Sequence, residues 1–103
     1  MKDLGKLMKQ AQQMQERLAE MQARLAEKTV EATSGGGMVK VVMNGKHEVV
    51  SLKIEPEVVN PSDVEMLEDL IIAALNEART RVDDMVRNEM SSLTGGLPIP
   101  GLF

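Results

Sequence analysis

Residues 34–54, SGGGMVKVVMNGKHEVVSLKI, combine the signals that decide the fold. Apolar residues recur at every second position on both sides of Asn44-Gly45, which is typical of strands with one buried face. Asn-Gly is a strong hairpin signal, because both central residues of a type I′ turn need positive φ. The stretch therefore predicts a β-hairpin with a two-residue turn. The register that this turn sets pairs Met43 with Lys46, Val41 with Glu48 and Val39 with Val50.

The two faces of this hairpin differ in composition. One face is apolar, and we expect it to meet the helices; it holds Val39, Val41, Met43, Val50, Leu52 and Ile54. The other face is mixed and carries Lys40, His47 and Lys53 together with two valines. We expect those valines, Val42 and Val49, to be half-buried by a partner.

A third strand is predicted before the hairpin, where Val30 and Ala32 alternate with Glu31 and Thr33. Three glycines at positions 35–37 then break the chain. A phosphate-binding Walker loop would end in Gly-Lys-Ser/Thr at the start of a helix. Here Met38 follows and a strand begins, so the glycines indicate a connection between strands.

The N-terminal segment has a heptad pattern. Its apolar residues are spaced 3, 4, 3, 4, 3, 4, at Leu4, Leu7, Ala11, Met14, Leu18, Met21 and Leu25. This predicts one helix from about Asp3 to about Glu27, roughly 35 Å long. A period of 3.5 favours a coiled-coil-like arm that projects from the body, and the alternative is a helix packed on its own domain.

A second long helix follows the sheet, which Pro56 ends. Two caps are possible, namely Asn60 before Pro61, or a capping box of Ser62 and Glu65. The helix should run to about Met90. Its middle is apolar on every side, so one small sheet cannot cover it. We expect a homodimer interface formed by Val42, Val49, Leu70, Ile71, Ile72 and Leu75.

Length and composition indicate one domain, residues 1–93, followed by a flexible Gly/Pro-rich tail, residues 94–103. The N-terminus has no continuous apolar region, and the longest apolar run, residues 70–75, is far short of the roughly 20 residues that span a bilayer. The chain has no cysteine, which fits a reducing cytosol. We therefore expect a cytoplasmic protein without a membrane partner.

Charge is distributed unevenly along the chain. The net charge is −4, but residues 1–28 hold six basic and four acidic residues, whereas residues 64–91 hold three basic and seven acidic ones. Three basic residues have an acid four residues earlier, which predicts the ion pairs Glu20–Arg24, Glu77–Arg81 and Asp83–Arg87.

Three lysines, Lys2, Lys6 and Lys9, share one face of the first helix. They lie in its first turns, where the helix dipole disfavours cations. Such a local conflict is expected at a functional site, and these lysines are the first candidates for contacts with DNA phosphates. Arg17 and Arg79 are further candidates. The alternative is a merely solvated lysine face.

Composition excludes most catalytic sites. His47 is the only histidine and cysteine is absent, so His/Cys zinc sites and histidine-based triads cannot form within one chain. We expect no enzyme, cofactor, metal or small-molecule substrate, and a solvated His47. Phe103 is the only aromatic residue, so the stacking platforms of single-strand binders are missing and a nucleic-acid partner should be a duplex.

Residues 34–41 (SGGGMVKV), Asn44-Gly45 and residues 51–57 (SLKIEPE) resemble the YbaB/EbfC family of bacterial nucleoid-associated proteins. Residues 65–78 (EMLEDLIIAALNEA), the Met- and Gln-rich first helix and the PGLF ending are similar to the same family. The resemblance implies an α+β fold in the order α-β-β-β-α and a tweezer-like homodimer with protruding helices. It also implies a nucleoid location and binding of duplex DNA with little sequence preference. It assigns no individual DNA contacts.

A different function remains open. A β element between two long helices also resembles prefoldin, a chaperone whose coiled-coil arms grip clients, and the nine methionines suit an adaptable binding surface. The sequence departs from that plan because its second helix is most apolar in the middle rather than at a free tip.

Overall fold

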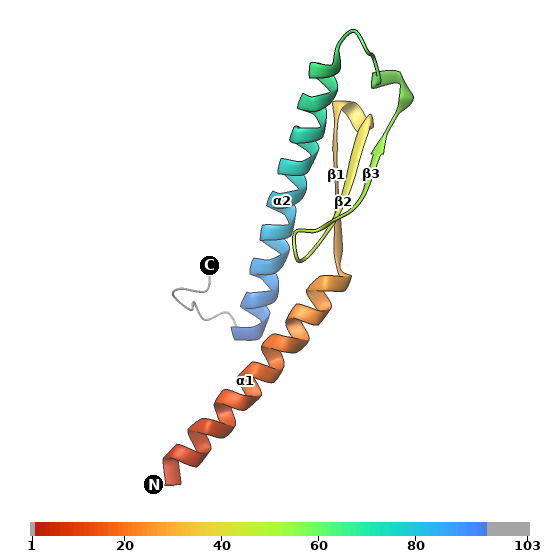
Figure 1. Cartoon of the computed structure of the whole chain (residues 1–103). Coiled ribbons are helices and arrows are strands. Elements are labelled where there is room, and N and C mark those ends of the chain that lie inside the picture. Colours follow the sequence, from red (N-terminus) through yellow and green to blue (C-terminus); the bar gives the residue numbers. More distant parts are fainter. Residues whose placement is uncertain (1, 95–103) are drawn as a thin grey trace.

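The computed structural model describes residues 2–94. A long helix, α1 (Lys2–Glu27), is followed by the strands β1 (Thr29–Ser34), β2 (Val39–Asn44) and β3 (Val49–Ile54) and by a second long helix, α2 (Val64–Thr94) (Figure 1). Short 3₁₀ turns at Gly35–Gly37 and Pro56–Val58 join the elements around the sheet. The predicted α+β class and the α-β-β-β-α order are confirmed.

The strands form one antiparallel sheet in the order β1-β2-β3. The helix α2 packs against β1 and β2. The buried core lies between them and consists of Ala32, Val39, Val41 and Met43 from the sheet and Ala74, Ala78 and Val82 from α2. The helix contributes two alanines, whose small side chains let the helix axis come close to the sheet.

The backbone conformation between β1 and β2 requires glycine. Gly35, Gly36 and Gly37 all have positive φ, at 59°, 67° and 93°, which is a region that other residues rarely adopt. The Ser34 hydroxyl donates a hydrogen bond to the Leu70 carbonyl oxygen at 2.6 Å. The predicted connection between strands is therefore confirmed, and it is tied to α2.

The predicted turn and register of the hairpin are wrong. The loop has three residues: Asn44 N–H donates to the Glu48 carbonyl and His47 N–H donates to the Asn44 carbonyl, both at 3.0 Å. His47 has the positive φ of 62°, as the last residue of a three-residue hairpin loop with a bulge does. Val39 lies opposite Ile54, Val41 opposite Leu52 and, beyond an irregularity, Met43 opposite Val49.

The Asn44 side chain accounts for the longer loop. Its Oδ1 accepts hydrogen bonds from the backbone N–H groups of Lys46 and Glu48, at 2.9 and 3.1 Å. This closes the turn around residues 45–47 rather than around Asn44-Gly45. Because the register moved by an even number of residues, Val41 and Leu52 still share one face of the sheet, as predicted.

Only part of that shared face meets a helix. Val39 and Val41 of β2 are fully buried, but Val50 and Leu52 of β3 are 58% and 46% exposed. A helix is about 10 Å wide and strands lie about 4.8 Å apart, so α2 covers two strands and leaves the third. The expectation that the whole apolar face meets the helices is therefore wrong for Val50 and Leu52, whereas Ile54 at the end of β3 does pack against the core.

The helix α1 touches the body only through its C-terminal half. Met21 and Leu25 are buried with Met90 of α2, and Leu18 and Leu93 pack against them. The N-terminal half continues beyond the end of α2 (Figure 1), and the molecule measures 73 × 21 × 17 Å. Its radius of gyration is 19.5 Å, against about 13 Å for a compact chain of 100 residues. The predicted projecting arm is confirmed.

The start of α2 differs from both predicted caps. Met66 N–H donates to Asp63 Oδ1 at 3.2 Å, so Asp63 caps the helix. Asn60 Oδ1 instead accepts a hydrogen bond from Ser62 N–H at 2.9 Å, which turns the chain just before the helix. The helix ends at Thr94 instead of about Met90. Of the predicted tail, residues 95–103 lie outside the described residues.

Gly45 holds the C-terminal end of α1 against the hairpin. Its N–H donates to the carbonyl oxygens of Leu25 and Lys28, at 2.8 and 3.1 Å. A Cβ atom on Gly45 would lie 2.7 Å from Leu25 Cβ and closer still to the Leu25 carbonyl oxygen. The glycine is needed for this close approach and not for a positive φ.

Gly45→Ala should therefore lower the free energy of unfolding by about 1–3 kcal/mol, because the backbone of α1 has to move away from the hairpin. Gly5→Ala is the matched control: no atom lies within 4 Å of its Cβ, and alanine is favoured in a helix by about 0.5–1 kcal/mol. Urea denaturation followed by circular dichroism measures both. Equal stability of the two variants would contradict the account of Gly45.

Candidate nucleic-acid interface

The ion pairs divide the basic residues into two groups. In the described part of the chain, six lysines and arginines form no ion pair: Lys6, Lys9, Arg17, Lys46, Lys53 and Arg79. The other described ones are paired within the fold. Cations without an acidic partner are the ones available to phosphate groups, so the first group defines the candidate surface.

One acid, Glu89 of α2, holds two of the paired cations. Arg24 lies 3.5 Å from its carboxylate, and Lys28 both hydrogen-bonds and ion-pairs with it. The hydrogen bond from Lys28 is the main cause that lowers the pKa of Glu89 below its usual value. The carboxylate therefore stays charged at neutral pH and ties the root of α1 to α2. The predicted pair Glu20–Arg24 is wrong, because Arg24 turns to Glu89 instead.

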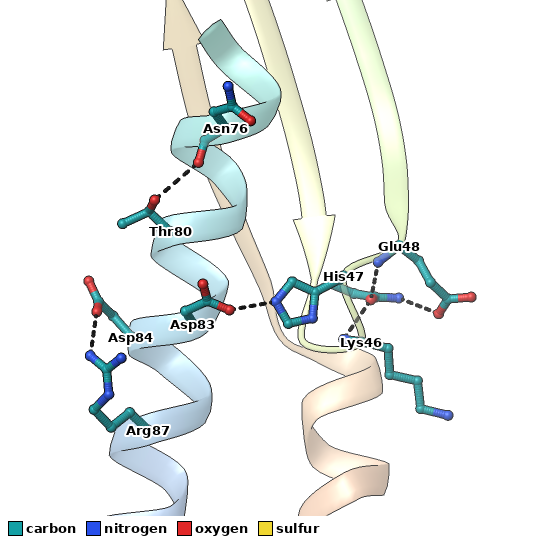
Figure 2. Close-up of polar contacts among 9 residues, drawn as sticks. Lys46, His47, Glu48, Asn76, Thr80, Asp83, Asp84 and Arg87 are labelled. Atoms are coloured by element: carbon teal, nitrogen blue, oxygen red, sulfur yellow. Dashed lines mark hydrogen bonds and ion pairs between the residues drawn. The ribbon is translucent and has the colours of Figure 1, made fainter. Parts of the chain in front are cut away.

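The other predicted pairs have mixed outcomes. Arg81 pairs with Glu77 at 3.2 Å, as predicted, and also donates to the Glu31 carbonyl. Arg87 pairs with Asp84 at 3.2 Å rather than with the predicted Asp83 (Figure 2).

The carboxylate of Asp83 is occupied by the histidine of the hairpin. His47 Nε2 lies 2.8 Å from Asp83 Oδ1, and Figure 2 shows the ring pointing from the hairpin to α2. The expectation of a merely solvated His47 is wrong. Its ring connects the hairpin to α2, and Lys46 beside it points away from α2 (Figure 2).

The arm, which we define as residues 3–17 of α1, presents the predicted basic surface. Lys6 and Lys9 are exposed there, and Arg17 lies on the same side of the helix at the root of the arm. Asp3 and Glu16 are the only acids among residues 1–17. Lys2 belongs to α1, but its side chain is outside the described part. The structure thus brings together Lys6, Lys9 and Arg17.

Arg79 does not join this group within one chain. Arg17 lies beside Leu93 at the end of α2, where both line a shallow depression. Arg79 is 14 residues before Leu93, about 21 Å along the helix, and Lys9 is eight residues before Arg17, about 12 Å further in the other direction. Sequence reasoning also missed Lys46. This cation is exposed and forms no ion pair, and it lies in the hairpin loop beside the C-terminal part of α1. Its position next to Asn44-Gly45 was the available signal.

Other site types find little support in the described residues. Within residues 3–93 no three metal-ligating side chains of the His, Cys, Asp or Glu type form a group. Neither α1 nor α2 is long and apolar enough to cross a membrane. A hollow of about 440 Å³ lies where Met21, Leu25 and Val86 meet the hairpin loop, and it belongs to the joint between α1 and the body.

Comparison with known proteins identifies the family of this chain. The model of the YbaB/EbfC DNA-binding family matches residues 1–97. The chain belongs to this family. The family assignment made from the sequence is thereby confirmed, and the family is a DNA-binding one rather than a known enzyme family.

Close relatives support the assignment over the full length. A protein of Thermoanaerobacter pseudethanolicus, described as nucleoid-associated, is 55% identical over 98% of this chain and 91% of its own length. A second one, of Paramagnetospirillum magneticum, is 55% identical over 100% and 96%. The crystal structure of an uncharacterized protein from Helicobacter pylori superposes with a TM-score of 0.75 at 26% identity, covering 91% of this chain and 96% of that one.

Proposed function

We propose that this chain is a nucleoid-associated protein that binds duplex DNA through the phosphate backbone, with little sequence preference, as a non-enzymatic homodimer. One observation carries the proposal: the cations of the arm are exposed and unpaired and project beyond an acidic body. The family and the names of its relatives support DNA as the partner and the nucleoid, in the cytoplasm, as the location.

The kind of contact follows from the side chains of the arm. Lysine is a compact point charge, so it attracts phosphates without distinguishing bases. Residues 64–91 carry a net charge of −4, and DNA is repelled from that part of the body. Both effects direct the duplex to the arm and favour binding that depends weakly on sequence.

The proposal of a homodimer is supported by apolar surface that one chain leaves uncovered. Val49, Val50 and Leu52 of β3 and Ile72 of α2 are 46–58% exposed. Of the predicted interface residues, Val42 is half-buried, and Leu70, Ile71 and Leu75 pack partly against the chain's own core. A second copy that covers both β3 and Ile72 of α2 would bury the exposed set, which is a better state for such a patch than contact with water.

Ile72→Lys tests the homodimer. Because Ile72 is 55% exposed in one chain, a charge there costs an isolated chain little, whereas it would be buried and unpaired in the interface. Sedimentation velocity at micromolar concentration should show dimers for the wild type and mostly folded monomers for the variant. Gln13→Lys, which adds the same charge at an exposed position on the outer side of the arm, away from β3 and Ile72, is the control. A wild type that sediments as a folded monomer would refute the homodimer.

Replacing Lys2, Lys6 and Lys9 together by glutamine tests the DNA contact. In a dimer up to about six phosphate contacts disappear, and the slope of log affinity against log salt should fall in magnitude by up to about 5. Affinity should drop for every duplex alike, because phosphate contacts do not read bases. The measurement is fluorescence anisotropy with unrelated duplexes at several salt concentrations.

Lys53→Gln is the control, since this exposed and unpaired lysine belongs to β3 and not to the arm. Unchanged affinity and salt slope in the triple variant would refute the assignment of the lysines. A wild type that binds no duplex at low salt but suppresses the aggregation of an unfolded client would replace the proposal by the prefoldin-like alternative.

A further inference from the structure

The arm carries an apolar stripe that nothing in the described structure covers. Leu4, Leu7, Met8 and Met14 are 56%, 60%, 60% and 40% exposed, and Ala11 is exposed between them. Scattered apolar residues on a surface need no explanation, but these follow one helix face over about three turns. A stripe of this length on a free helix indicates a partner.

The stripe continues a helix–helix seam that is already present. Leu18, Met21 and Leu25 occupy the next positions of the same heptad pattern, and they pack against α2. Leu93 is the last residue of α2 that packs against this cluster, and α2 ends one residue later, at Thr94. The apolar positions of α1 therefore extend past their partner by two heptads.

We propose that the arm of a second copy of this chain completes the seam, with the two arms antiparallel. In that arrangement Leu4 of one arm packs against Met14 of the other, and Leu7 packs against Ala11. Each of the two central layers then combines a large and a small side chain, which lets the helices approach closely. The pair is symmetric, so each contact occurs twice.

Charge favours the antiparallel direction. Asp3 and Arg17 flank the stripe on the same side, at equivalent heptad positions, and Gln10 lies midway between them. Two antiparallel arms bring Asp3 of each next to Arg17 of the other and place the two Gln10 residues together. Parallel arms would instead place Asp3 beside Met8 and Arg17 beside Gln22, so that neither charge gains a partner.

The lysines of the arm stay free in this arrangement. Lys6 and Lys9 lie on the side of α1 opposite the stripe, so paired arms present two basic faces that point away from each other. One arm pair can then contact two duplexes, a consequence that rests on the proposed DNA contact, whereas the pairing itself does not. Two heptads associate weakly, and many copies held close together on DNA raise their effective concentration.

The absence of cysteine makes a direct test possible. Gln10→Cys places the two thiols next to each other in the antiparallel pair, so mild oxidation without DNA should link two chains. Gln13→Cys, on the outer side of the same helix, is the matched control and should link several-fold more slowly. Met14→Cys separates the directions, because its thiols meet in a parallel pair but face Leu4 in an antiparallel one.

Charge exchange provides an independent readout. Asp3→Arg and Arg17→Asp should each slow the linking of Gln10→Cys several-fold, and the double exchange should restore it. The arm lies outside the buried core, so all variants should keep the wild-type melting temperature. Restoration by the double exchange is a result that a structural defect cannot produce.

Three outcomes would overturn the proposal. Equal linking of Gln10→Cys and Gln13→Cys means random collisions, and faster linking of Met14→Cys means parallel arms. Linking of Gln10→Cys that requires removal of residues 95–103 means that the chain's own C-terminal segment covers the stripe. Because the experiment contains no DNA, its failure leaves the proposed DNA binding untouched.

Discussion

A single helix, α2, has to cover more apolar surface than one helix can, and the rest of the structure depends on this limit. The middle of α2 buries the inner face of β1 and β2 through Ala74, Ala78 and Val82. Its last turns bury Met21 and Leu25 of α1. Apart from Ile54, which packs against the core, the apolar residues of β3 and those of the arm are left uncovered, so the two uncovered apolar surfaces have the same origin.

Contacts at the C-terminal end of α1 determine the direction in which the arm projects. Gly45 hydrogen-bonds to the last turn of α1, and Glu89 holds Arg24 and Lys28. These contacts fix the direction in which α1 leaves the body. Arg24 and Lys28, which lie next to α2, are neutralised by Glu89. The unpaired positive charge of α1 therefore lies further out, on the arm. Separation of the basic arm from the acidic body follows from the fold and does not require a special motif.

Sequence patterns predicted the elements well because periodicity is a property of the whole element. The heptads of α1 and the alternation in β2 and β3 specify type, extent and buried face, and an error of four residues in register keeps Val41 and Leu52 on one face. The turn was mispredicted because a single side chain, Asn44, decides between loops of two and three residues. Its hydrogen bonds to two backbone N–H groups are invisible in a pattern of apolar and polar residues.

Ion pairs and caps were predicted less well, because they depend on which partner arrives from elsewhere in the fold. Arg24 has an acid at the favourable spacing in its own helix, yet Glu89 from α2 is the acid that it meets. Asp83 is likewise taken by His47, which comes from the hairpin. The exposure of the arm lysines was predictable for the opposite reason. No other element of the described chain packs against this part of α1, so no acid from elsewhere in the fold pairs with Lys6 or Lys9.

The central claim is that the arm, and not the sheet or α2, contacts the duplex. Titration of ¹⁵N-labelled protein with a short duplex of arbitrary sequence, followed through backbone amide chemical shifts, tests it residue by residue. The account predicts that the largest shifts cluster in residues 3–17 of α1 and shrink as salt is added. Shifts concentrated in β3 or in the middle of α2, with the arm unchanged, would contradict it.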